Sequence, residues 1–117
     1  MFELEGGVNT VVELSINSLV GLTNPGTMKV RGKLQEEEIV VLIDCGATHN
    51  FISKKLVKEK KLHTKETAHY GVILGYGTAI KGKGVCENVE LLLNEWKVKT
   101  EFIPLELGGA DAILGMQ

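Results

Sequence analysis

The residue of this 117-residue chain that most suggests chemistry is Asp44, which directly follows the five apolar residues Ile39–Ile43. The next residues, Cys45-Gly46-Ala47, predict a sharp turn. Aspartate is almost never fully buried without partners, so this carboxylate is either hydrogen-bonded within a turn or used in a reaction. Taken alone, an aspartate that starts a turn is the simpler interpretation.

Cysteine and histidine side chains are the other candidates for chemistry. His49, His63 and His69 could suggest a metal site, and Cys45 with His49 could suggest a nucleophile and its base. A metal site needs convergent ligands, and no closely spaced pair offers them. An anionic Asp44 beside Cys45 disfavours the thiolate that a nucleophile needs. We therefore expect no metal ion and no cofactor, and we interpret Cys45 and Cys86 as free thiols.

The elements that position Asp44 are predicted to be mainly strands. Ile39–Ile43 is β-branched and apolar at both parities, which is typical of a strand covered on both faces. Ser53 is a good N-cap for one short helix over Lys54–Lys61. A glycine-rich tip at Gly75-Tyr76-Gly77 predicts a hairpin. The predicted strands are 10–19, 28–34, 39–43, 72–74, 78–80, 85–93 and 96–102, with a brief apolar run at 110–114.

Length, charge and hydropathy exclude several classes of protein. A chain of this length fits one domain, since domains usually have roughly 100–150 residues. The net charge is −2 and the pI is about 5.9, so no basic surface for nucleic acid is expected. No apolar run approaches the ~20 residues of a membrane span, and no signal peptide is evident. We predict a cytoplasmic, intracellular protein that binds neither nucleic acid nor membrane.

One long stretch changes the weight given to Asp44. The sequence VVLIDCGATHNFIS resembles the signature of plant Ty3/gypsy-type LTR retrotransposon aspartic proteases, apolar-apolar-Asp-Ser-Gly-Ala-Thr-His-Asn-Phe-Ile, with Cys45 in place of the serine. The resemblance continues over 27–32, 74–77, 84–86 and 111–117. An Asp-x-Gly motif followed much later by Ile-Leu-Gly, with a glycine-rich hairpin between them, is specific to this family.

The resemblance implies a mainly β fold, a pepsin-like (retropepsin) half that forms a small closed β-barrel with one short helix. Residues 27–117 would form this retropepsin-like domain, and residues 1–26 an N-terminal strand and linker region of the same single domain. The parent would be a retrotransposon Gag-Pol polyprotein. Two copies would form a homodimer and process a peptide or polyprotein substrate.

The resemblance also assigns roles to single residues. Asp44 would be catalytic, paired with its copy in the second subunit, because two carboxylates about 3 Å apart cannot both ionise and so supply one acid and one base. The other residues fall into three groups. The active-site loop would be Cys45, Gly46 and Ala47; the substrate-binding flap Leu74, Gly75, Tyr76, Gly77 and Thr78; and the segment packed on the loop Ile113, Leu114 and Gly115.

Cys45 is the departure that keeps a second hypothesis open. The family usually has a Ser or Thr there, whose hydroxyl helps to join the two Asp loops, whereas a thiol is a weak donor and a weak acceptor. The alternative is a retropepsin-fold module that binds peptide or self-associates and is catalytically weak or inactive. A generic small β-barrel binding domain is a third interpretation, which requires the motif match to arise by chance.

Overall fold

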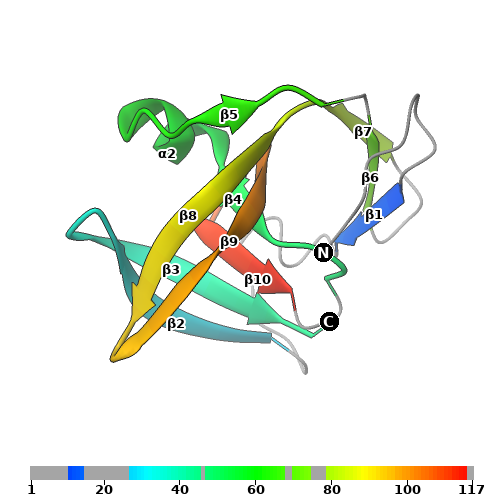
Figure 1. Cartoon of the computed structure of the whole chain (residues 1–117). Helices are drawn as coiled ribbons and strands as arrows, with labels where there is room; N and C mark the ends of the chain where they lie inside the picture. Colours follow the sequence, from blue (N-terminus) through cyan, green and yellow to red (C-terminus); the bar gives the residue numbers. More distant parts are fainter. Residues whose placement is uncertain (1–10, 15–26, 46, 68–69, 75–78, 116–117) are drawn as a thin grey trace.

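The described part of the chain is mostly β-strand in this computed structural model, which describes residues 11–14, 27–45, 47–67, 70–74 and 79–115 (Figure 1). In chain order the elements are β1 (Val11–Leu14), β2 (Thr27–Leu34), β3 (Glu37–Asp44), β4 (Phe51–Ser53), α2 (Lys54–Glu59), β5 (Thr64–Lys65), β6 (Tyr70–Leu74), β7 (Ala79–Gly82), β8 (Val85–Leu93), β9 (Trp96–Leu105) and β10 (Ala112–Gly115).

Six of the strands close into a barrel. They are hydrogen-bonded in the order β2-β3-β10-β4-β9-β8, and the pairing of Lys33 on β2 with Leu92 on β8 completes the circle. β5 adds to the outer edge of β8. The expected fold class, a mainly β chain with a small closed barrel and one short helix among the described residues, is confirmed.

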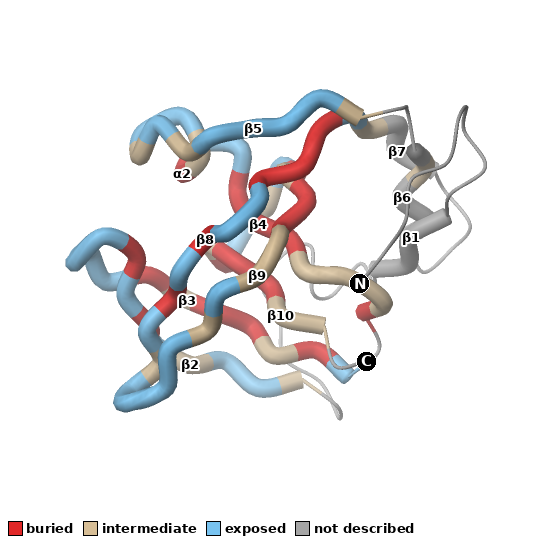
Figure 2. The backbone as a smooth tube through the Cα atoms, in the orientation of Figure 1, coloured by how far each residue is buried: buried red, intermediate tan, exposed pale blue. Residues whose placement is uncertain are grey.

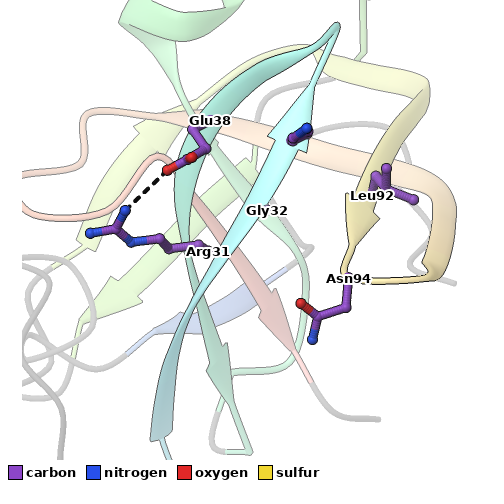
Figure 3. Close-up of a pocket in the computed structure, with 6 residues that line it drawn as sticks. Arg31, Gly32, Glu38, Leu92 and Asn94 are labelled. Carbon is purple, nitrogen blue, oxygen red and sulfur yellow. Dashed lines mark hydrogen bonds and ion pairs between the residues drawn. The ribbon is translucent and has the colours of Figure 1, made fainter.

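Gly32 lies where β2 approaches β8 at the closure of the barrel. A Cβ there would lie 2.7 Å from Leu93 Cδ2, which is the end of a flexible side chain, and 3.1 Å from the Leu92 carbonyl oxygen, so glycine favours the close approach of β2 and β8. Figure 3 shows the outer side of this crossing, where Arg31 and Glu38 form an exposed ion pair at 3.1 Å. Exposed pairs of this kind contribute little stability.

The apolar core lies inside the barrel, and β3 is covered on both faces. Ile39 and Val41 belong to the core cluster, together with Ile52 of β4 and Phe102 of β9. Figure 2 shows these buried segments along the barrel strands and the exposed hairpin turns between them. Leu42 points the opposite way and is fully buried too, in one row with side chains of the neighbouring strands: Leu42, Ile113, Phe51 and Ile103. The two-sided burial predicted for Ile39–Ile43 is therefore confirmed.

Several element boundaries differ from those predicted. The helix starts after its expected cap, where Ser53 Oγ accepts from the Leu56 N–H at 3.4 Å, but it ends at Glu59 rather than Lys61. Lys61 has a φ of 52°, which no α-helix can continue. β3 begins at Glu37, two residues before the predicted start, because the turn is made by Gln35-Glu36, both with positive φ. Of the strand predicted over 10–19, residues 11–14 are a strand and the rest lies outside the described residues.

Two short strands were not predicted, and one strand is longer than expected. β4 and β5 have three and two residues. β9 continues from Phe102 to Leu105 because β4 provides a parallel partner, pairing Phe51 with Ile103. The predicted hairpin of β8 and β9 is confirmed, with Leu93 opposite Trp96.

A second, three-stranded sheet has the order β1-β6-β7. β6 and β7 form the predicted antiparallel hairpin, and β1 adds to the free side of β6 in parallel. Figure 1 shows this sheet at one end of the molecule, on the side toward which β3 and β10 point. It therefore lies apart from the barrel wall made by β2, β3 and β10.

Candidate active site

Asp44 is the last residue of β3 and is 3% exposed. It pairs with Thr27 on β2 and with Gly115 on β10, so a strand flanks it on each side. The chain turns immediately after it, because the Ala47 N–H donates to the Asp44 carbonyl oxygen at 3.3 Å. The central strands of the sheet thus hold this carboxylate at the point where the backbone leaves the barrel.

Gly115 brings β10 against the loop that follows Asp44. A Cβ at Gly115 would lie 2.7 Å from the carbonyl oxygens of both Ala47 and His49. Ile113 and Leu114, the other two residues expected to pack here, pair with Leu42 and Ile43 on β3. The structure therefore places the Ile113–Gly115 segment beside the end of β3 and beside the described part of the loop. Gly46 lies outside the described residues.

Asn50 joins three segments at this site, a role that the sequence analysis missed. Its Oδ1 accepts from the Gly115 N–H at 2.9 Å, and its Nδ2 donates to the Glu101 carbonyl oxygen at 3.3 Å. Its own carbonyl oxygen accepts from the Ile103 N–H at 2.9 Å. These bonds tie the end of the Asp44 loop to β10 and β9. The sequence feature that could have indicated this role is an amide side chain directly before Phe51-Ile52, which are both buried.

Asp111, like Asn50, has a structural role that the sequence did not reveal. Its Oδ2 accepts from the Val40 N–H at 2.8 Å, and its N–H donates to the Val40 carbonyl oxygen at 2.8 Å. Its carbonyl oxygen accepts from the Ser53 N–H at 2.9 Å. Asp111 therefore links β3 to β4 just before β10 begins.

The cysteine and histidine candidates lie in different environments. Cys45 is exposed and Cys86 is buried in β8, where its Sγ lies 3.6 Å from Thr64 Oγ1. Burial raises the pKa of the Cys86 thiol, partly offset by that hydrogen bond. His49 Nδ1 lies 2.8 Å from Thr48 Oγ1, and burial lowers the pKa of His49. Among the described residues, no three His, Cys, Asp or Glu side chains are grouped as metal ligands.

The predicted flap lies mostly outside the described residues. Leu74 ends β6, and Gly75, Tyr76, Gly77 and Thr78 are not described. The arms of the hairpin are described, with Tyr70 opposite Gly82 and Ile73 opposite Ala79. In the described part of the chain, no helix has both the length and the apolar character of a membrane span.

Comparison with known proteins agrees with this geometry. The family model for retroviral aspartyl proteases matches residues 23–117, which include every barrel strand and Asp44. A search of curated proteins found no match. Since the family model covers most of the sequence, the chain belongs to the retroviral aspartyl protease family.

Proposed function

We propose that this protein is an aspartic endopeptidase in which Asp44 is the catalytic residue and two copies of the chain form one active site. The observation that carries the proposal is the position of Asp44, buried at the end of the central strand β3 and followed at once by a turn. Membership of the retroviral aspartyl protease family supports the same reaction.

In this proposal the second copy of the chain contributes the second catalytic aspartate. The sequence contains only two, Asp44 and Asp111. The Asp111 carboxylate accepts the Val40 N–H, so it is already used to hold the barrel together. Two copies of this sequence related by a two-fold axis would bring two Asp44 carboxylates to one site, and this is the arrangement that we propose.

The chemistry is that of a carboxylate pair which shares one proton. The ionised carboxylate takes a proton from a water molecule, and that water attacks the carbonyl carbon of the peptide bond. The protonated carboxyl group donates a hydrogen bond to the carbonyl oxygen as negative charge develops there. The proton taken from the water is then given to the amide nitrogen as the C–N bond breaks and the C=O bond re-forms, so the carboxylate pair returns to its starting state. The substrate is a peptide segment of a polyprotein. The β6–β7 hairpin carries the flap that closes over this peptide.

A second candidate function rests on Cys45. This exposed thiol stands directly after Asp44, and it is a weaker hydrogen-bonding group than a hydroxyl. A looser contact between the two loops would favour a module that binds peptide or self-associates without cleaving it.

The test compares the wild-type protein with Asp44→Asn, which keeps the shape of the side chain and removes its charge. Cleavage of an unstructured protein at acidic pH should occur only with the wild type and should stop with a pepstatin-type inhibitor. Circular dichroism should show the same fold for both proteins. An Asn variant that cleaves at the wild-type rate would show that Asp44 is not catalytic. A wild-type protein that dimerises and binds peptide but does not cleave would favour the second candidate.

A further inference from the structure

The strand β1 pairs with the hairpin that carries the proposed flap. Val11 lies opposite Gly71, Val12 opposite Val72, Glu13 opposite Ile73 and Leu14 opposite Leu74, all in parallel. These four residues precede the range matched by the protease family, which begins at residue 23. The pairing is therefore a feature of this chain that the family match does not account for.

The base of the β6–β7 hairpin is fixed to the barrel. Thr67 Oγ1 accepts from the Gly84 N–H at 2.8 Å, which joins the chain before β6 to the chain after β7. Just before this point, β5 pairs with β8, with Thr64 opposite Cys86 and Lys65 opposite Val85. The base of the hairpin is therefore held on both sides.

The arms would be weak without a third strand. A two-stranded hairpin is marginally stable in water, and the free edge of β6 would leave a row of backbone N–H and C=O groups unpaired. Such an edge binds an extended peptide by adding it as a further strand. In this protein β1 occupies that edge, and β6 becomes the middle strand of three.

We propose that residues 11–14 are an intramolecular strap, which fills the peptide-binding edge of β6 and sets how readily the β6–β7 hairpin opens. The occupant of the edge is this segment of the same chain. A segment tethered to the domain binds at a high effective concentration, so even a strand of four residues holds its place. The effect on catalysis rests on the proposed function, because the hairpin is a flap only if the protein cleaves peptides.

Proline substitutions in the full chain test the strap by hydrogen exchange. In a parallel ladder, alternate residues of a strand direct their N–H groups to the neighbouring strand, so one of Val12→Pro and Glu13→Pro removes a bond to β6. In the other variant, the N–H that proline lacks would have pointed away from β6, and an edge strand tolerates a proline at such a position. We expect roughly tenfold faster exchange at residues 70–73 and 79–82 in at least one variant. Amides of β3 serve as the internal reference and should not change. Unchanged exchange of β6 in both variants would overturn the proposal.

A cross-link tests the same pairing without proline. In a Cys45→Ser background, the pair Val12→Cys and Val72→Cys is in register and should form a disulfide under mild oxidation, as detected by mass. The control pair Val12→Cys and Leu74→Cys is two residues out of register and should not. Equal cross-linking of both pairs, or of neither, would contradict the strap.

The cross-linked protein also separates the two proposals. If the strap controls the flap, the disulfide form should cleave peptide severalfold more slowly, and a reductant should restore the rate. Absence of cleavage in the wild type would defeat the proposed function, while the exchange and cross-link results would still decide the strap. Full activity of the cross-linked form would refute control of the flap by residues 11–14.

Discussion

Asp111 and Val40 are joined by two hydrogen bonds of opposite direction, one from each backbone N–H, and both are 2.8 Å long. The acceptor for Val40 is the Asp111 carboxylate, and the acceptor for Asp111 is the Val40 carbonyl oxygen. The second of the two aspartates in the chain is thus part of the frame that positions the first.

Replacement of Asp111 by alanine leaves the Val40 N–H without its acceptor. We expect the free energy of unfolding to fall by about 1 kcal/mol, because a partly buried backbone donor loses its acceptor. Asp111→Asn keeps an oxygen that can accept, so its loss should be smaller. Urea denaturation of the three proteins measures the difference, and equal midpoints would show that the carboxylate does not stabilise β3.

Gly115→Ala should displace the loop that follows Asp44. The added Cβ would lie 2.7 Å from two backbone carbonyl oxygens, neither of which is the flexible end of a side chain. We expect a loss of roughly 1–3 kcal/mol in stability and loss of peptidase activity. Gly71→Ala is the matched control, because a Cβ there meets nothing within 4 Å. Similar effects of the two substitutions would argue against close packing at Gly115.

Gly84→Ala should weaken the base of the β6–β7 hairpin. Gly84 has a φ of +94°, and a Cβ there would lie 3.0 Å from Thr64 Cγ2. Both the backbone strain, about 1–3 kcal/mol, and the contact oppose the substitution. Hydrogen exchange should become faster at residues 79–82 and stay unchanged in β3. Exchange that is unaffected in the hairpin would show that its base tolerates the change.

The two thiols should react at very different rates. Cys45 is exposed, while Cys86 is fully buried, and burial raises the pKa of its thiol. In the native monomer, a thiol reagent should therefore modify one cysteine per chain, Cys45, and the second only after unfolding. Cys45→Ser should remove the fast phase. Two fast phases in the native protein would contradict the burial of Cys86.

His49 should make the protein less stable in mild acid. Burial lowers its pKa in the folded protein below the ordinary value of 6.5. Above that value His49 is neutral in both states, so the stability it contributes is complete. As the pH falls below 6.5, the unfolded chain binds the proton first, and this stability is lost as the pH falls through the folded pKa.

The matching experiment is urea denaturation of the wild type and of His49→Gln at about pH 7 and about pH 5. Glutamine does not titrate, so the variant should lose less stability between the two values. Parallel losses in the two proteins would assign the acid sensitivity to other groups.

Local composition was enough to predict the elements that show a clear pattern of apolar and polar residues within their own segment. Ile39–Ile43 is apolar at both parities, and buried side chains lie on both faces of this strand. Ser53 before a run of helix-forming residues marked the start of α2, and the alternation around Asn94-Glu95 marked the β8–β9 hairpin. The motif around Asp44 pointed to the family that the comparison then showed.

Tertiary structure decided what depends on segments far apart in the chain. β4 and β5 are too short to show a period, and they are strands only because β9, β10 and β8 pair with them. β9 continues through Pro104 beside Ile52 of β4, and Pro104 lies beyond Phe102, the last residue of β9 that pairs with β8. Periodicity describes one segment, whereas pairing is chosen by packing between segments. For this reason the closure at Gly32, the bonds of Asp111 and Asn50, and the parallel addition of β1 to β6 could be seen only in the folded protein.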